Sequence, residues 1–532
     1  METSAGGGEM KYYFEKLQKK IDKYRYKYGN SPRKAALKLT WWNFKCIFKR
    51  YSKNQENSEF IVSVYPKDIL RIAIAEGGGI GDALIQSTYI KEIRKLFYNK
   101  KIIIDFYCHA YKLFQNFPFI DHTYPYNMGI DKDKYDVCLI SRRFYIVDKL
   151  SPKTKYYSEK FYNFCLDCKD ITDNKLSGEY NDNLYSQYAL ILGKNRIEQS
   201  NIHNLINVDR YTPCYMQWSL DAFNILNTYN LDQNAYITIS RNVGTNDSSS
   251  HPKLWLYEYY NELIKFIKKD YPNIKIVQIG SSDTEKIIKG IDINLVGKTT
   301  LEEIKVLLKY AKLHIDIEGG MVHLRHFLYG VSAVIFGPTK PDIFAYDNNI
   351  NCHSSICPFT CEWVTRNWTK KCINQYRFHI CMKDLKPEFV YNKINDYLKN
   401  EIEWNLVVDE MKPLNSIKNK NVAIIGDASD YPEIIANNNV TIFDNTVVGI
   451  LKNAEYATPY NISSNNISFD FVICKNLPTS YSIYAFNELV RILKEDGFLI
   501  LGGKITNELS KKLNIDNLNG DYISIKKIRK IL

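Results

Sequence analysis

The chain has 532 residues, of which 45% are hydrophobic, and this composition excludes wholesale disorder and predicts two to four globular domains. Its 12 cysteines lack the dense pattern of a small disulfide-stabilised domain, which favours metal ligation or simple burial in a reducing cytosol. The sequence contains no apolar run of 18 residues and no secretory leader, so we expect a cytoplasmic protein.

The net charge of +12 is concentrated near the N-terminus. After a leader or disordered start at 1–9, a basic helical segment is expected at 10–66, and its residues 10–54 hold 14 Lys and Arg but only Glu15 and Asp22 as acids. Because the remainder is close to neutral, nucleic-acid binding is not indicated. The cationic, aromatic-rich helices either pack on the main body or lie on an anionic membrane surface, where each basic residue contributes about 1 kcal/mol.

The first α/β unit is expected over residues 67–225. A buried strand at 69–75 runs into a glycine-rich turn, and a helix at 83–97 and a further strand follow. The turn does not match the dinucleotide-binding fingerprint, because Asp82 stands where the third glycine would be. No Gly-Lys-Ser/Thr follows it either, as a phosphate-binding loop would require. A dinucleotide-dependent or ATP-hydrolysing enzyme is therefore disfavoured.

A second α/β unit is expected over residues 226–400, and its most informative stretch is 314–341. There a strand ends near Glu318, the pair Gly319–Gly320 forms a turn, and a helix opens at His323 before the next strand. Such a turn lets backbone N–H groups approach a phosphate at the positive end of the helix, although ordinary α/β proteins also contain such turns. Two units of this kind facing each other across a cleft form the usual architecture for binding a nucleotide-linked substrate.

A third unit is expected over residues 420–532, after a linker at 401–419. Its order of elements resembles a class I methyltransferase domain, with Asp444 at the end of the second strand. Only Gly426 remains of the three glycines in that family's fingerprint, and the domain is short. We therefore expect a structural or interaction domain without bound S-adenosylmethionine (SAM), and a working methyltransferase fused to the first two units is the alternative.

Four motifs of the first two units resemble the family-nine glycosyltransferases, the ADP-heptose:lipopolysaccharide heptosyltransferase group. The resemblance covers residues 69–400 and implies an α/β architecture of the GT-B fold, with two facing Rossmann-like domains. The motifs are Gly81-Asp82 with the helix after it, Ser240-Arg241 with Lys253-Leu254-Trp255, Leu295-Val296-Gly297-Lys298-Thr299, and Glu318-x-Gly-x-x-His323 with Phe336-Gly337-Pro338-Thr339.

The resemblance implies an inverting transfer of a sugar from a nucleotide donor to a lipopolysaccharide, another surface glycan or a protein. A carboxylate must take the proton of the acceptor hydroxyl, and the resemblance assigns this role to Asp82, whose alternative role is to cap its helix. Lys253 would neutralise the leaving diphosphate, unless it is only a solvated lysine. The residues implied in substrate binding are Gly81, Ser240, Arg241, Glu318, Gly319, Gly320, Met321 and His323.

The sequence departs from the family at one turn. Glu318 stands where the family usually has Asp, Gly319 replaces Ser, and Met321-Val322 replace Pro-Met. Because Glu is one methylene longer, the donor could be ADP-heptose or another nucleotide sugar. The substitutions also leave open a non-catalytic scaffold that binds nucleotide sugars in glycan assembly. No cofactor is expected to be required for catalysis.

A cysteine-rich loop is expected at 352–381. Cys357, Cys361, Cys372 and Cys381 could supply four thiolate ligands to a structural Fe or Zn ion, or remain free buried thiols. Their spacing lacks the tight Cys-x-x-Cys pairs of zinc ribbons but resembles the iron-binding heptosyltransferases that modify autotransporter adhesins. A metal at this loop is expected to pin the loop rather than to catalyse.

Overall fold

The computed structural model describes the chain from residue 68 to residue 529, with gaps. The residues outside the description are 1–67, 98–99, 116, 143, 172–188, 213, 215, 217, 242, 244–250, 282–285, 358–360, 362–371, 373–378, 400–403, 410–413, 445–453, 503–505, 514–521 and 530–532. The chain divides into two compact units, Met1–Tyr65 and Pro66–Leu532. The predicted leader at 1–9 and basic segment at 10–66 therefore lie outside the described residues. In the part that is described, no helix is both long enough and apolar enough to cross a membrane.

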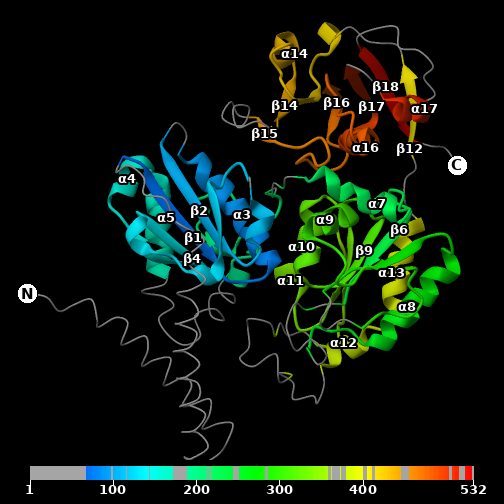
Figure 1. Ribbon diagram of the computed structural model, residues 1–532, viewed down its shortest axis with the longest axis horizontal. Helices are drawn as coiled ribbons and strands as arrows, with labels where there is room; N and C mark the ends of the chain where they lie inside the picture. Colours follow the sequence, from blue (N-terminus) through cyan, green and yellow to red (C-terminus); the bar gives the residue numbers. More distant parts are fainter. Residues whose placement is uncertain are drawn as a thin grey trace, which may run out of the picture. The chain divides into compact units, whose positions relative to one another are not determined.

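The first sheet has the strand order β3-β2-β1-β4-β5. Its strands are β1 (Leu70–Glu76), β2 (Ile102–Cys108), β3 (His122–Pro125), β4 (Val137–Ser141) and β5 (Tyr145–Leu150). The helices beside it in Figure 1 are α3 (Ile80–Lys95), α4 (Lys153–Tyr157) and α5 (Glu159–Asp170). Only β5, at the edge, is antiparallel to its neighbour. All seven residues of β1 are buried, as expected for the central strand of a parallel sheet.

Helix α3 follows β1 and is buried on nearly every side. All residues from Ala83 to Ile93 are buried. The hydroxyl groups of Ser87 and Thr88 donate hydrogen bonds to the carbonyl oxygens of Leu84 and Ile85, which satisfies these polar groups within the helix itself. A helix surrounded by protein needs no strong amphipathic pattern, so the glycine turn is the clearer sequence signal of its start. The helix begins three residues earlier than the sequence predicted.

The second sheet is wholly parallel, with the strand order β11-β10-β9-β6-β7-β8. Its strands are β6 (Tyr236–Ile239), β7 (Lys275–Gln278), β8 (Ile293–Asn294), β9 (Leu313–Ile317), β10 (Ser332–Phe336) and β11 (Ile350–His353). The helices of this part are α7 (Asn224–Thr228), α8 (Tyr257–Asp270), α9 (Leu301–Tyr310), α10 (Gly320–Phe327), α11 (Pro341–Phe344), α12 (Ile380–Asp384) and α13 (Pro387–Lys399). The strand order reverses between β6 and β9, and ligands of open α/β sheets bind at the carboxyl ends of strands at such a point.

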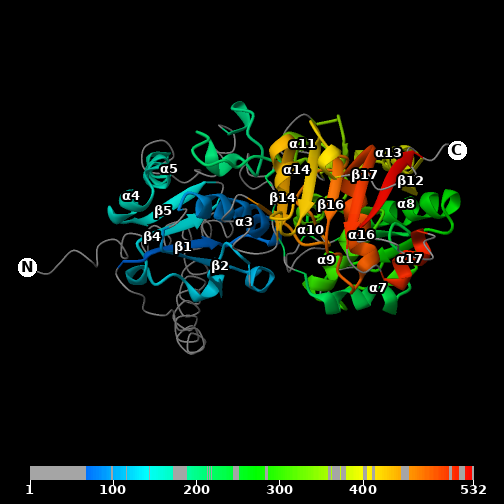
Figure 2. The same cartoon turned by 90° about the horizontal axis from the view of Figure 1, so that it is seen from above.

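The third sheet has the strand order β12-β18-β17-β16-β13-β14-β15, and Figure 2 shows several of its strands side by side. Its strands are β12 (Trp404–Asp409), β13 (Asn421–Ile425), β14 (Asn439–Asp444), β15 (Glu455–Tyr456), β16 (Phe469–Cys474), β17 (Leu493–Gly502) and β18 (Tyr522–Arg529). Its helices are α14 (Pro432–Asn437), α16 (Ser482–Ile492) and α17 (Asn507–Leu513). Strand β18 is antiparallel to both of its neighbours. The segment predicted as a linker at 401–419 contains β12, which forms the edge of this sheet.

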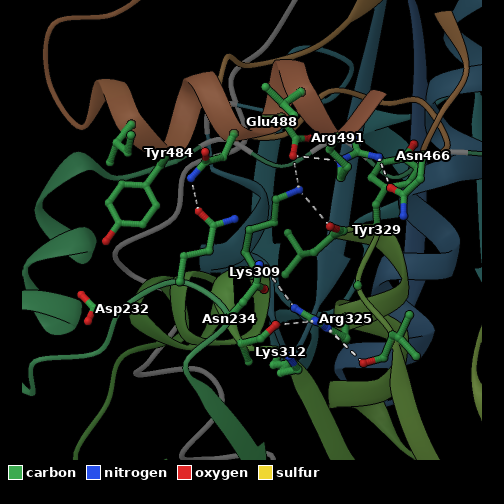
Figure 3. Close-up of a pocket in the computed structure, with 18 of the residues that line it drawn as sticks. Asp232, Asn234, Lys309, Lys312, Arg325, Tyr329, Asn466, Tyr484, Glu488 and Arg491 are labelled. Carbon is green, nitrogen blue, oxygen red and sulfur yellow. Dashed lines mark hydrogen bonds and ion pairs between the residues drawn. The ribbon is translucent and has the colours of Figure 1, made fainter. Parts of the chain in front are cut away.

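The predicted α/β class is confirmed, and two sheets of mainly parallel strands, as a GT-B fold requires, are present before the third sheet. Helix α16 of the third sheet contacts α9 through a buried ion pair. Lys309 Nζ lies 2.9 Å from a carboxylate oxygen of Glu488, which also accepts hydrogen bonds from Arg491 (Figure 3). Beside this pair is a cavity of about 730 Å³. None of the residues predicted for the site lines that cavity.

Candidate active site

The N-termini of helices α3 and α10 meet at two glycines. A Cβ atom on Gly81 would lie 2.5 Å from Cδ2 of His323 and 3.3 Å from Cα of Gly320. The helices can approach so closely because neither glycine carries a side chain. Both helices follow central strands, β1 and β9, and their positive ends face one another. The structure therefore brings together the two glycine turns that the sequence singled out.

Asp82 lies in the first turn of α3 and is held by an arginine. Its carboxylate is 2.5 Å from Nη2 of Arg196, whose side chain is only 5% exposed, and it also accepts a hydrogen bond from the Gly79 N–H. Asp82 therefore does bond to the backbone at the start of its helix, which is the capping role considered above as the alternative. The Asp82 side chain is still 36% exposed, so a substrate can reach it. Arg196 escaped sequence reasoning because no motif or periodic pattern surrounds it.

Glu76 is a second carboxyl group beside Asp82, and it was not predicted. It ends β1, and its Oε1 accepts a hydrogen bond of 2.7 Å from the Gly78 N–H. Burial raises the pKa of Glu76 to about 7; the charge of Asp82 adds to this rise, whereas the charge of Arg196 opposes it. In the sequence, Glu76 looks like the first residue of the glycine turn. Only its burial in the folded chain marks it as a candidate functional carboxyl group.

Lys253, Glu318 and His323 form a second cluster at the carboxyl end of β9. Nζ of Lys253 lies 2.6 Å from Oε2 of Glu318, and Nε2 of His323 lies 3.6 Å from Oε1 of Glu318. Burial alone would raise the pKa of Glu318, but the charge of Lys253, together with the hydrogen bond and charge of His323, holds it at about 2. Trp255 anchors the lysine segment, since its buried indole donates a hydrogen bond to the Leu385 carbonyl oxygen.

Tyr346 contacts the His323 ring of this cluster, and no motif in the sequence marks it. Its hydroxyl lies 2.5 Å from Nδ1 of His323, and its ring stacks on His326 with the centroids 3.4 Å apart. Burial lowers the pKa of His326 to about 3, so this histidine is neutral and stacks as an uncharged ring. Tyr346 therefore holds the His323 ring in place through the ring nitrogen that faces away from Glu318.

The remaining predicted binding residues lie at the same sheet edge. Ser240 and Arg241 follow β6 and are buried, and the Ser240 N–H donates to the Ile315 carbonyl oxygen of β9 at 3.0 Å. Gly319 has extended backbone at the start of α10, and Met321 is partly buried against the core. Strands β6 and β9, which position these residues, flank the reversal in strand order.

Three of the four predicted metal-ligating cysteines act electrostatically on the fourth, Cys381. Burial raises the pKa of the Cys381 thiol to about 12, and the charges of Cys361, Cys357 and Cys372 act in the same direction. Cys357 and Cys361 are buried, whereas Cys372 and Cys381 are partly exposed. Within the described residues, no group of three or more side chains has an arrangement that could hold a metal ion. Much of the loop between these cysteines lies outside the description.

Comparison with known proteins identifies the middle of the chain. Residues 223–372 match the sequence model of glycosyltransferase family 9 (heptosyltransferase). This segment is therefore similar to glycosyltransferase family 9. It contains Ser240, Lys253 and the turn from Glu318 to His323, whereas Gly81 and Asp82 lie outside it. The predicted resemblance is thereby confirmed for the second sheet.

Individual proteins to which the chain is similar include one curated relative and several solved structures. A lipooligosaccharide heptosyltransferase 2 of Campylobacter jejuni is 32% identical over 107 residues, which cover 20% of this chain and 32% of that protein. The match thus spans about a third of the relative's length. The E. coli ADP-heptose LPS heptosyltransferase II structure is 13% identical and covers 62% of this chain and 99% of its own, with a TM-score of 0.41. The structure of the dodecameric iron-containing heptosyltransferase TibC in complex with ADP-D-beta-D-heptose is 14% identical to this chain. The match covers 63% of this chain and 78% of TibC, with a TM-score of 0.42.

Proposed function

We propose that this protein is an inverting glycosyltransferase, which moves a sugar from a nucleoside-diphosphate donor to a hydroxyl group of a surface glycan or a protein. The observation that carries the proposal is the contact between Gly81 and His323. It brings the start of α3, whose first turn carries Asp82, against the start of α10, where backbone N–H groups can hold a diphosphate. The family-9 match of the second sheet supports the same activity.

In the proposed reaction, Asp82 accepts the proton of the acceptor hydroxyl while the hydroxyl oxygen bonds to the anomeric carbon of the donor. The bond between that carbon and the diphosphate oxygen breaks, and the diphosphate leaves with the electron pair. The N–H groups at the start of α10, together with Lys253, stabilise the charge that develops on the leaving group. Attack from the face opposite the leaving group inverts the configuration of the anomeric carbon.

We propose ADP-heptose as the first donor to test, since the curated relative is a heptosyltransferase. Glu318 sits at the position where a sugar or ribose hydroxyl would be bound, and its carboxylate is already ionised by Lys253 and His323. An ionised carboxylate accepts hydrogen bonds from two neighbouring hydroxyl groups and does not donate one. Donors that differ in the stereochemistry of these hydroxyls should therefore differ in affinity. We propose that the acceptor is modified on the cytoplasmic side of a membrane.

Calorimetric titration with ADP-heptose, other ADP-sugars, UDP-sugars and GDP-sugars tests donor binding. Transfer is then followed as release of the nucleoside diphosphate in the presence of lipopolysaccharide or cell-envelope extract. We expect one donor class to bind, and Asp82→Asn to keep that affinity while transfer falls about 10²- to 10⁴-fold, as for loss of a general base. Folded protein that binds none of the donors would contradict the proposal, and unchanged transfer by Asp82→Asn would exclude Asp82 as the base.

A second candidate function is a scaffold that binds a nucleotide sugar without transferring it. The observation that favours it is that both predicted catalytic side chains have protein partners, Arg196 for Asp82 and Glu318 for Lys253. A scaffold would bind the donor with the same selectivity but release no diphosphate with any acceptor extract. The diphosphate-release assay therefore separates the two functions.

The cysteine-rich loop suits Fe or Zn in its chemistry, because four thiols can provide a tetrahedral set of sulfur ligands. The charges of Cys361, Cys357 and Cys372 all act on the Cys381 thiol, which supports a shared site. The described side chains are not arranged as a ligand set, so the fit is one of donor type and not of geometry. We propose a structural ion that pins the loop after β11, and no step of the transfer depends on it.

A further inference from the structure

Glu76 and Ser141 face each other where the order of the first sheet reverses. They are the last residues of β1 and β4, and they are neighbours in the parallel register of these strands. The strands on either side of this pair connect in opposite directions, so the pair marks the crevice at the carboxyl edge of the sheet. Glu76 is only 3% exposed, and the chain turns from it directly into the glycine loop that leads to Asp82.

One buried donor beside this crevice lacks a hydrogen bond. Nη1 of Arg196 has no partner among the described residues, whereas the Ser141 hydroxyl interacts with the carboxyl group of Glu76. The other nitrogen of the same guanidinium, Nη2, is bonded to Asp82, and Oε1 of Glu76 is bonded to Gly78. Buried polar groups without partners are rare in native proteins and are concentrated where a catalytic role or a bound water explains them. One donor of the guanidinium that holds Asp82 thus remains unused.

We propose that Glu76 and Asp82 share Arg196, and that ionisation of Glu76 draws the guanidinium partly away from Asp82, which frees Asp82 to accept the acceptor's proton. This inference rests on the sugar transfer proposed above. Glu76 is then a positioning residue that touches neither substrate. In each turnover the proton passes from the acceptor hydroxyl to Asp82 and then to solvent, so Glu76 neither gains nor loses a proton in the reaction itself.

The charges around Glu76 support this division of roles. The groups that act on it are Asp82 from α3, Arg196, Ser141 from β4 and the Gly78 N–H, and it acts in turn on Tyr145 of β5 and Cys108 of β2. Burial would lower the pKa of Arg196, but the charges of Asp82 and Glu76 raise it, so the guanidinium stays charged between two carboxyl groups. Because the pKa of Glu76 is raised to about 7, its ionisation falls within the working pH range of an enzyme.

The test is the pH profile of kcat/KM for transfer by the wild type, Glu76→Gln, Glu76→Asp and Asp105→Asn. Asp105 is a fully buried carboxyl group of β2 in the same sheet, bonded to Tyr135 and not to Arg196, and it is the matched control. We expect the wild-type profile to rise through an inflection near pH 7. Glu76→Gln should lack this inflection and stay at the low-pH level, at least about tenfold below the wild type at pH 8.5, since general-base catalysis contributes about 10²- to 10⁴-fold. Glu76→Asp and Asp105→Asn should keep the inflection.

An inflection that persists in Glu76→Gln would overturn the inference while leaving the proposed function intact. An equal loss of activity at every pH in both Glu76 variants would assign Glu76 a purely structural role and also overturn it. Absence of transfer by the folded wild type would overturn both proposals. Thermal unfolding provides a readout of Glu76 that does not depend on transfer: the wild type should lose stability relative to Glu76→Gln as the pH rises from about 4.5 to about 7, because burial favours the protonated form.

Discussion

Nζ of Lys253 lies 2.6 Å from Oε2 of Glu318, and the two side chains are only 14% and 6% exposed. Lys253 is the residue predicted to neutralise the leaving diphosphate, and Glu318 is the residue at which the sequence departs from the family pattern. A diphosphate that reaches Lys253 must therefore compete with Glu318 for its charge. Donor affinity should depend on both residues together, and a double-mutant cycle with donor binding as the readout measures that coupling.

Glu318→Gln should lower the free energy of unfolding by about 3 kcal/mol, because it leaves the largely buried Lys253 without its counter-charge. Chemical denaturation near pH 7 measures this change. The matched control is Asp148→Asn, which removes the partner of the exposed Lys132 and should cost less than about 1 kcal/mol. Equal costs for the two substitutions would contradict a buried pair.

The same pair predicts a pH dependence. The pKa of Glu318 is lowered from 4.5 to about 2 against the effect of burial, mainly by the charge of Lys253. Its ionised form therefore stabilises the protein fully above pH 4.5, and this stabilisation is lost as the pH falls toward 2. The difference in stability between the wild type and Glu318→Gln should shrink over that window. A difference that is constant from pH 5 to pH 3 would show that Glu318 does not titrate as the pair requires.

Gly81→Ala should disturb the meeting of the two helix N-termini. The added Cβ would lie 2.5 Å from the His323 ring, so the ring or the helix must move. We expect kcat/KM to fall about 10²-fold, because a displacement of about 1 Å at a reacting centre costs that much. Gly79→Ala is the control, since its Cβ would meet no atom within 4 Å and the N–H that it donates to Asp82 is kept. Comparable losses in the two variants would point to the glycine loop itself and not to the helix contact.

Glu488→Gln should destabilise the contact between α9 and α16. The carboxylate is 3% exposed and interacts with Lys309 and Arg491, so its loss leaves one buried and one partly buried cation without this counter-charge. The cost should be about 3 to 5 kcal/mol by chemical denaturation. Asp496→Asn, at the exposed pair with Lys526, is the control and should cost less than about 1 kcal/mol. If Glu488→Gln left the free energy of unfolding unchanged, the third sheet would fold and unfold independently of α9.

Elemental analysis of the purified protein tests the cysteine-rich loop. We expect close to one Fe or Zn per chain, falling to less than half in Cys361→Ser and Cys381→Ser, because a thiolate ligand cannot be replaced by a neutral hydroxyl without loss of affinity. Cys474→Ser is the control: this buried thiol of β16 lies in the third sheet. A wild-type content below about 0.2 metal atoms per chain would exclude a tightly held ion.

Local sequence patterns predicted the glycine turns after β1 and β9, the α/β class and the residues that converge at the site, because such turns and buried strands are encoded within short windows. They did not predict Arg196, which pairs with Asp82 across 114 residues of sequence. Glu76 and Tyr346 were also missed, since burial alone gives their polar groups a role. The start of α3 was placed too late for a similar reason: a helix buried on all sides lacks the periodic pattern that marks its boundaries.

Lys309 also bears on how shortened versions of this protein would behave. Its side chain is 5% exposed, and its ammonium group donates to Asn461 and the Leu328 carbonyl oxygen as well as pairing with Glu488. Cutting the chain after the second sheet would expose this lysine, and with it the side of α9 next to the end of α10. A truncated protein that lost activity would thus reveal damage to a supporting surface, and such a loss would be no sign of a second catalytic centre in the part removed.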